Sequence, residues 1–270
     1  MAPAHAHYDQ KLASVYDQMY PIQADTDQAV AYLAGLLPPT GRLLELGVGT
    51  GRVAVPLAEH GFHVHGIDDS EAMLAKLRER DPKGLVTSRL GDFTATGTGE
   101  RFDVVTLLMN TLFAAVTKEQ QITCLRNARK QLAPGGRFVL QAFDPALYHT
   151  MSRPDLSVRY LGETAIMLDT LVIDRSQQIM VGVHTILDGG PPQTRRHMLR
   201  YAFPFEIDLL AELAGLRLVS RMGDWAGGAY TSASTGHISV YERAGERDAG
   251  TRPEDAAGPG EADCTAVRPL

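Results

Sequence analysis

Short apolar runs alternate with amphipathic helical patterns along the first half of the chain. The runs predict strands at 43–46, 63–68, 86–92, 102–109 and 137–143, and the patterns between them predict helices at 52–60, 70–80 and 118–132. The glycines of "APGG" (133–136) suit a cap at the end of the last helix. Strands that alternate with helices through short connections indicate a parallel sheet with helices on both faces. We therefore predict a doubly wound α/β fold.

The pattern changes after residue 164. Three β-rich runs between 165 and 203 are separated by turn signals at 174–177 and 188–193, which predicts an antiparallel meander. A helix and two strands follow, at 204–213, 217–222 and 237–242. The prediction is a small antiparallel β insert after the fifth strand, at about 150–203. It would serve as a substrate lid, as an oligomer contact, or simply as a cover for the sheet.

Composition separates residues 245–270 from the rest of the chain. This segment is rich in Gly, Pro, Ala and charge, which predicts a disordered tail after one domain at 1–244. The formal net charge of -6 disfavours a nucleic-acid partner. No apolar run approaches the roughly 20 residues of a membrane span. Cys124 and Cys264 read as free thiols, so we expect a cytoplasmic protein.

Glycine is concentrated directly after the first strand, in "ELGVGTG" (45–51). Ligands of open α/β sheets bind at the carboxyl ends of the strands, and glycine there leaves room for them. The third glycine of a dinucleotide fingerprint is missing, because Arg52 stands in its place, and no phosphate-loop G-K-[ST] follows. Glu45 would repel a pyrophosphate but suits a cationic ligand.

Two acidic residues follow the next two strands. Asp68 lies about twenty residues after the loop, where a carboxylate can accept both hydroxyls of a ribose. Asp92, followed by Phe93, can accept an exocyclic amine. We expect Asp68 to be solvated when no ligand is bound. Loop and acids together describe a site for an adenosine that carries a positive charge and no phosphate, and S-adenosylmethionine is such a molecule.

The motifs, taken in order, resemble those of class I S-adenosylmethionine-dependent methyltransferases. They are "LLELGVGTGR", "GIDDSEAML", "GDF", "FDVVTLLMNTLF" and "LAPGGRFVL", and they cover roughly residues 40–145. More loosely, "NTLF", the insert and "GDWAGGAYTSASTGHISVYER" resemble small-molecule methyltransferases of actinobacterial natural-product pathways, some of which methylate amines of sugars and peptides. The resemblance implies a Rossmann-like, seven-stranded methyltransferase sheet.

The resemblance also implies which residues hold the cofactor. The implied set is Tyr16, Glu45, Gly47, Gly49, Gly51, Asp68, Met73, Asp92, Phe93, Leu108 and Met109. The glycines would wrap the methionyl end, and Glu45 and the Leu108 carbonyl would hold its ammonium. Asp68 would bind the ribose, and Asp92 with the Phe93 N–H would bind adenine. Asp69 departs from the family, in which this position is often apolar and covers adenine. It either points to solvent or leaves that cover to Met73.

The acceptor decides whether a base is needed. The cofactor's methyl group is already activated, so alignment is the main task, and a neutral amine needs no strong base. A hydroxyl usually needs a base or a metal. The candidate bases are His149, His184, His197 and His237, of which His184 on the insert is favoured. Tyr20, beside Tyr16 in an N-terminal segment that often closes over the cofactor, is the second catalytic candidate.

Metal spacing is not convincing. His65 with Asp69 and His184 with Asp188 match H-x-x-x-D, but on strands this spacing spans roughly 13 Å. We predict no metal. The place after the fourth strand reads "LMNTLF", without the Asn/Asp-Pro-Pro-aromatic run of enzymes that methylate nucleobase amines.

These observations favour a methyltransferase for a small-molecule amine in secondary metabolism, with no membrane or nucleic-acid partner and a homodimer as one option. Acidic and aromatic residues near the end, Asp224, Trp225 and Tyr230, lean toward an amine acceptor. The alternatives are an O- or C-methyltransferase with a histidine base, and a non-catalytic protein that binds the same cofactor.

Overall fold

The computed structural model describes Tyr16 and residues 24–245 of the 270-residue chain. The tail predicted from residue 245 onward therefore lies, apart from Gly245, outside the described residues, as do Tyr20 and Cys264. In the described part, one sheet has seven strands and a second sheet has four. No helix in this part is long and apolar enough to cross a membrane.

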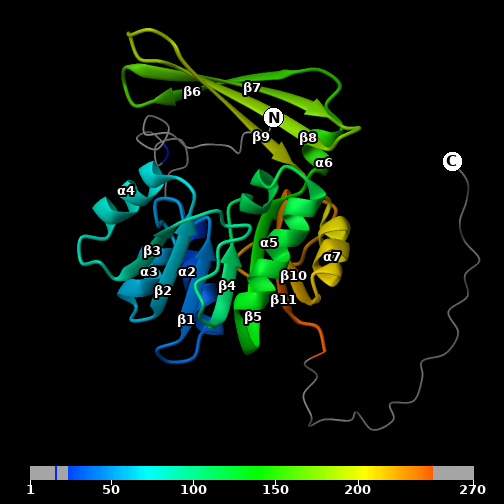
Figure 1. Cartoon of the computed structure of the whole chain (residues 1–270). Coiled ribbons are helices and arrows are strands. Elements are labelled where there is room, and N and C mark those ends of the chain that lie inside the picture. Colours follow the sequence, from blue (N-terminus) through cyan, green and yellow to red (C-terminus); the bar gives the residue numbers. More distant parts are fainter. Residues whose placement is uncertain (1–15, 17–23, 246–270) are drawn as a thin grey trace, which may run out of the picture.

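The larger sheet has the strand order β10-β11-β5-β4-β1-β2-β3 (Figure 1). Its strands are β1 (Arg42–Leu46), β2 (His63–Asp68), β3 (Val86–Leu90), β4 (Phe102–Leu107), β5 (Leu132–Phe143), β10 (Leu216–Met222) and β11 (Gly236–Arg243). β1 to β5 are parallel, and β11 is antiparallel to both of its neighbours. The carboxyl ends of the parallel strands therefore share one edge, which confirms the predicted doubly wound sheet.

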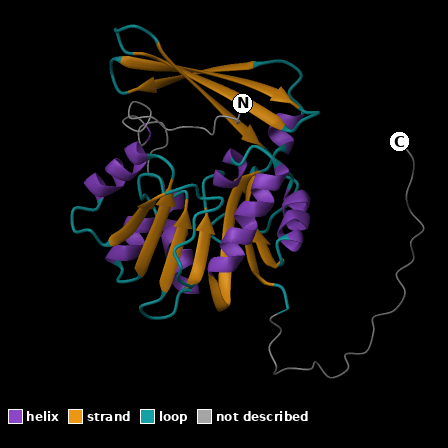
Figure 2. Cartoon of the chain, in the orientation of Figure 1, coloured by secondary structure: helices purple, strands orange, loops and turns teal. Residues whose placement is uncertain are grey.

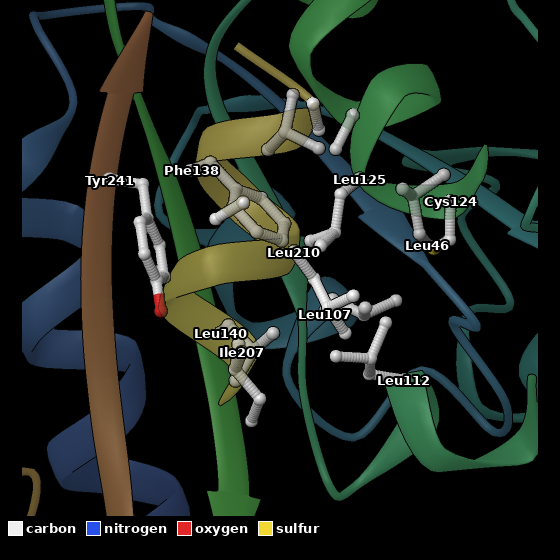
Figure 3. Packing of buried hydrophobic residues seen from close by; sticks show 14 of the residues in the cluster. Leu46, Leu107, Leu112, Cys124, Leu125, Phe138, Leu140, Ile207, Leu210 and Tyr241 are labelled. Carbon is white, nitrogen blue, oxygen red and sulfur yellow. The ribbon is translucent and has the colours of Figure 1, made fainter. Parts of the chain in front are cut away.

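Helices cover both faces of this sheet. They are α2 (Ala24–Leu36), α3 (Ala54–Glu59) and α4 (Glu71–Arg80) on one face, and α5 (Lys118–Gln131) and α7 (Pro204–Leu213) on the other. Neighbouring strand residues point to opposite faces, so Leu43 packs with α2 and α3 and Leu44 with α5 and α7. Figure 3 shows the buried residues on the face that α5 and α7 cover, where Leu210 of α7 lies near Phe138 of β5. Burial on both faces explains why the strands read as continuous apolar runs.

Local signals set where the helices begin. The Ser70 hydroxyl accepts the Met73 N–H, so α4 begins at Glu71, one residue later than predicted. Thr117 and Gln120 form a capping box at the start of α5. Two short turns, η1 (Thr111–Ala114) and α6 (Ala146–His149), follow β4 and β5.

The prediction of a glycine cap after α5 was wrong. The cap is Leu132, whose backbone is already extended with φ -69° and ψ 136°. Leu132 pairs with Phe102, so β5 begins before the glycines, and a register shift between Phe102 and Val104 absorbs them. Gly135, with φ 72°, turns the chain inside the strand and not at the helix end.

The insert is a four-stranded antiparallel sheet, not the three-stranded one that was predicted. Its strands are β6 (Asp155–Leu161), β7 (Ala165–Asp174), β8 (Ile179–Leu187) and β9 (Gln193–Arg200), paired in that order. The prediction missed β6, most of whose residues are exposed, so that no buried run marks it. Figure 2 shows the insert beyond the carboxyl ends of the parallel strands.

Candidate cofactor and acceptor site

The glycine loop after β1 is anchored to β2 and has one open position. Gly47, Gly49 and Gly51 all have positive φ, at 73°, 54° and 74°. The N–H groups of Gly47 and Val48 donate to the Ile67 carbonyl at 2.8 and 3.1 Å. A Cβ added at Gly47 would lie 2.4 Å from Cγ2 of Thr111, whereas one at Gly49 would meet nothing within 4 Å. The loop is therefore packed at its start and open at its middle glycine.

Asp68 ties this loop to the end of β2. Its carboxylate accepts the N–H of Gly49 at 2.8 Å and the N–H of Ser70 at 2.9 Å, and the residue is only 8% exposed. Burial raises the pKa of Asp68 to about 6, while the two backbone hydrogen bonds oppose that rise. The expectation that Asp68 is solvated in the empty protein was wrong, because the loop folds back over it. A carboxylate can still accept further hydrogen bonds at its remaining lone pairs.

Glu45, at the end of β1, is a buried carboxyl group with an unsatisfied atom. It is 4% exposed, and its Oε2 has no hydrogen-bond partner in the described residues. Burial and the neighbouring Asp68 raise the pKa of Glu45 to about 8, against the opposing effect of Arg52. A buried polar atom without a partner is costly. A ligand ammonium at this place would remove that cost.

Asp92 and Phe93, which follow β3 after Gly91, differ in their exposure to solvent. Asp92 is exposed, and its Oδ1 accepts the backbone N–H and the hydroxyl of Thr94 at 2.8 and 2.7 Å. Phe93 is buried, and its carbonyl accepts Nδ2 of Asn127 at 3.1 Å. This arrangement holds the Asp92 carboxylate at the carboxyl edge of the sheet, where its predicted adenine contact would be made.

The turn after β4 has two consecutive residues with positive φ. Met109 and Asn110 have φ of 52° and 65°, which ends the strand two residues earlier than predicted. Gln141 of β5 accepts both of their N–H groups. The Met109 N–H donates to Oε1 of the Gln141 side chain at 3.3 Å, and the Asn110 N–H donates to the Gln141 backbone carbonyl at 3.2 Å. The Asn110 side chain accepts the Phe143 N–H at 2.6 Å. β5 therefore holds this turn at both ends.

A pocket of about 300 Å³ opens beside this turn, and we call it the edge pocket. The residues that line it are Asp25, Gln28, Met109, Asn110, Gln141, Ala142, Phe143, Gly223, Asp224, Trp225, Thr235, Gly236, His237 and Ile238. They come from α2, from the ends of β4 and β5, from the loop after β10 and from the start of β11. The edge pocket therefore lies at the carboxyl edge of the sheet, where ligands of α/β folds bind.

Comparison with known proteins decides the family. A family model described as "Methyltransferase domain" matches residues 43–136. The cypemycin N-terminal methyltransferase of a Streptomyces species is 33% identical over 239 residues, which cover 87% of this chain and 97% of that protein. The chain belongs to the S-adenosylmethionine-dependent methyltransferases.

Two further relatives agree with this assignment. The methyltransferase CcbJ from Streptomyces caelestis has a solved structure that matches with a TM-score of 0.83 at 38% identity, covering 89% of this chain and 99% of that one. A dTDP-4-amino-2,3,4,6-tetradeoxy-D-glucose N,N-dimethyltransferase of Saccharopolyspora spinosa is 29% identical over 139 residues, covering 50% of this chain and 55% of that protein. The methyltransferase sheet and the insert are thus features of a known architecture.

The residues at the carboxyl edge fit the cofactor of this methyltransferase, S-adenosylmethionine. The unsatisfied Oε2 of Glu45 suits the cofactor's ammonium, and the space above Gly49 allows close approach to the backbone. The Leu108 carbonyl fits less well, because it already accepts the N–H of Thr111 at 3.0 Å and its hydroxyl at 2.7 Å. Both of its lone pairs are in use. Thr111 was not singled out from the sequence, although it forms the base of the glycine loop.

Three other predicted cofactor residues differ in how the structure places them. Met73 is 2% exposed in the first turn of α4, and its side chain is part of the buried interior. Met109 lines the edge pocket. Tyr16 is half-buried in the N-terminal segment.

In the described part of the chain, no group of three or more His, Cys, Asp or Glu side chains could hold a metal ion.

The four candidate histidines lie in different places, and His184 is the one that the sequence analysis favoured. His184 is in the insert and does not line the edge pocket; its Nδ1 bonds to Asp169, and its ring stacks on His197 at 4.6 Å between centroids. His237 lines the pocket, is 1% exposed, and bonds through Nδ1 to the Ser239 hydroxyl at 2.8 Å. Its Nε2 has no partner in the described residues. His149 instead bonds to the Tyr201 hydroxyl at 2.9 Å.

Some of the residues that line or support the edge pocket were named in the sequence analysis, and others were not. Trp225 is buried and packs on Tyr32 of α2, with ring centroids 5.7 Å apart. Tyr230 does not line the pocket, but its hydroxyl donates to Asp144, just after β5. Asp25, Gln28 and Gln141 were missed, because no local pattern tells that α2 and β5 face the same cavity.

Proposed function

We propose that this methyltransferase acts on an amine nitrogen of a small molecule. The observation that carries the proposal is the character of the pocket histidine. Among the described lining residues His237 is the one histidine, and burial lowers its pKa to about 4. So weak a base is poorly suited to a hydroxyl acceptor, whose proton has to be removed, whereas a neutral amine needs none. Two relatives support the same choice: one is named as an N-terminal methyltransferase of cypemycin, and the other as an N,N-dimethyltransferase of an amino sugar.

The chain's own task in this reaction is alignment and exclusion of water. S-adenosylmethionine supplies an activated methyl group that the lone pair of an amine can take directly. Glu45 would hold the cofactor's ammonium, and Asp68 would keep the glycine loop in its open shape. Met109 and Asn110, which we call the floor of the edge pocket, line the pocket just after β4. Rigid placement of the acceptor beside the cofactor is the main source of rate acceleration for such a transfer.

A screen of acceptors tests this function. The purified chain is incubated with methyl-deuterated S-adenosylmethionine and a panel of acceptors. The panel contains C-terminally amidated peptides with a free amino terminus (peptide amides), amino sugars and phenols, and the products are identified by mass spectrometry. We expect label on amine nitrogen only. A Glu45→Gln variant should lose transfer to every acceptor. Labelled phenols with unlabelled amines would contradict the proposal.

A hydroxyl acceptor is the second candidate, and one observation favours it. The Nδ1 of His184 bonds to Asp169, which leaves Nε2 as the basic nitrogen, an arrangement that a general base requires. If the insert closes over the edge pocket, this pair would be the base. The His184→Gln variant distinguishes the two candidate functions. It should abolish transfer to a hydroxyl and leave transfer to an amine largely intact.

We propose two roles for the insert at 150–203, as a lid and as a contact with a second copy. The register of β6 and β7 places Leu156, Val158 and Tyr160 on one face, where they are 62%, 53% and 83% exposed. An exposed apolar stripe of this kind is typical of an interface. Sedimentation should show a dimer that Val158→Lys dissociates.

Two other properties of the chain bear on its location and partners. The free, buried thiol of Cys124 supports a cytoplasmic location. The net charge of -6 supports the absence of a nucleic-acid partner.

A further inference from the structure

The described residues that line the edge pocket carry negative charge and no positive charge. Asp25 and Asp224 line it, and among the described lining residues no lysine or arginine is present. The remaining titratable residue is His237, and burial together with the nearby Arg221 lowers its pKa to about 4, so it is uncharged at neutral pH. A molecule that enters the pocket therefore meets two carboxylates whose charge no described lining residue neutralises.

The two carboxylates are available to a ligand. Asp25 lies in the first turn of α2. Asp224 is held by the Gly228 N–H, which donates to its Oδ1 at 2.9 Å. Both residues are exposed, and neither forms an ion pair within the described part of the chain. The two residues come from elements far apart in the sequence, α2 for Asp25 and the loop after β10 for Asp224.

We propose that the acceptor is a cationic amine with no phosphate or carboxylate group near its reacting nitrogen. This inference rests on the proposed N-methylation and narrows its substrate class. An amine is mostly an ammonium ion in water, and two carboxylates raise its local concentration at the pocket. Because Asp25 and Asp224 are exposed, the bound ammonium can pass its proton to water. The neutral amine that remains has the lone pair that takes the methyl group, so one proton is released to solvent for each transfer. A nucleotide-linked sugar brings a diphosphate, which the same carboxylates repel and for which the described lining offers no cation. The pocket therefore selects free amines or peptide amino groups over nucleotide sugars.

The chain's single tryptophan makes this testable without knowledge of the natural acceptor. Trp225 lines the edge pocket, so its fluorescence, excited where the probes do not absorb, reports occupation of the pocket. Full-length protein saturated with S-adenosylhomocysteine, which blocks the cofactor site, is titrated with three probes. They are phenylalaninamide as the cation, N-acetylphenylalanine as its anionic counterpart, and thymidine diphosphate.

We expect phenylalaninamide to change the emission with a saturable curve that weakens as salt is added, and the two anions to leave it unchanged. Asp25→Asn and Asp224→Asn should each weaken phenylalaninamide by roughly twofold to fivefold, and the double variant by about tenfold. Asp27→Asn is the matched control, since Asp27 lies in the same helical turn but does not line the pocket. It should leave binding unchanged.

Binding of thymidine diphosphate, or equal binding of the two phenylalanine probes, overturns the inference. So does binding of no probe at all, because the pocket then does not select cations. Failure of the proposed function is a separate result. It would appear as transfer to hydroxyls in the acceptor screen while phenylalaninamide still binds in an Asp-dependent way. Methylation of a nucleotide amino sugar in preference to peptide amides would support N-methylation and overturn this inference alone.

Discussion

The carboxylate of Asp68 accepts the backbone N–H of Gly49 across 2.8 Å, so the end of β2 and the glycine loop hold each other in place. Asp68→Ala removes the acceptor of two backbone donors, Gly49 and Ser70, in a buried place. An unsatisfied buried donor costs about 1–3 kcal/mol. We expect urea unfolding to show a loss of about 2–4 kcal/mol, and calorimetry to show tenfold or greater weakening of S-adenosylhomocysteine.

Asp69→Ala is the control for that variant. Asp69 is half-buried and follows Asp68 directly, so the change has the same chemistry one position along. We expect its effect on unfolding to stay below about 1 kcal/mol. A larger effect on cofactor affinity for Asp69→Ala than for Asp68→Ala would show that the ribose contact belongs to Asp69.

Glu45 should make cofactor binding depend on pH. Its pKa of about 8 means that the carboxyl group is largely protonated in the empty protein at neutral pH. A ligand ammonium favours the ionised form, so binding should tighten as pH rises from about 6 to 8 and release a proton. Calorimetry in buffers of different ionisation enthalpy measures that release. Glu45→Gln should remove both the proton release and most of the affinity.

The same shifts predict how the empty protein responds to pH. The pKa values of Glu45 and Asp68 are raised, to about 8 and about 6, so the folded state binds more protons than the unfolded state between about pH 4 and 8. Through these two groups, stability is highest below their unfolded pKa values and is lost as pH rises through the folded ones. A melting temperature that falls across this window, and falls less with S-adenosylhomocysteine bound, is the expected result.

Gly47 and Gly49 should respond differently to the same substitution. In Gly47→Ala the new Cβ would lie 2.4 Å from the Thr111 side chain, at a φ of 73°, so we expect a loss of stability of more than about 2 kcal/mol. In Gly49→Ala the Cβ meets open space, and only the φ of 54° costs about 1–2 kcal/mol. Cofactor affinity should instead fall sharply, because the methyl group enters the cofactor's space. Similar unfolding curves for both variants would contradict this account.

Tyr230 should affect the acceptor and not the cofactor. Tyr230→Phe leaves a buried oxygen of Asp144 without its donor and frees the loop that carries Trp225. We expect the acceptor KM to rise severalfold and the Trp225 emission to shift to the red, with unchanged affinity for S-adenosylhomocysteine. Tyr148→Phe is a fair comparison, because the Tyr148 hydroxyl makes no hydrogen bond within the described residues, and it should change neither value.

Elements buried on both faces or marked by local chemistry could be predicted with their bounds. The strand at 63–68 and the helix at 204–213 lie where the sequence indicated, the first because its run is buried and the second because Pro204 begins the helix. β6 could not be found, since an edge strand with exposed side chains depends on β7 for its pairing. An element can therefore be predicted from the sequence when burial or a residue such as proline marks it, and not when it depends on pairing with a distant strand.

The site could be predicted only where one motif contains all its parts. The glycine loop and Glu45 lie within seven consecutive residues, and the structure places them together. The burial of Asp68 arises from a loop nineteen positions away, and the edge pocket joins α2 to β11. Such contacts depend on how layers pack, which no local pattern encodes. For the same reason, no local pattern indicates that His237 lines this pocket and that His184 does not.

The double attachment of the Met109–Asn110 turn to Gln141 has a consequence for how this enzyme can change. Two residues with positive φ carry conformational strain, and the three hydrogen bonds from β5 keep them there. The floor of the edge pocket is thus intolerant of substitution, while another part of its lining comes from the loop that joins β10 to β11. Directed evolution toward new acceptors should therefore accumulate its substitutions between 223 and 235, and libraries that vary the floor should mostly yield unfolded protein.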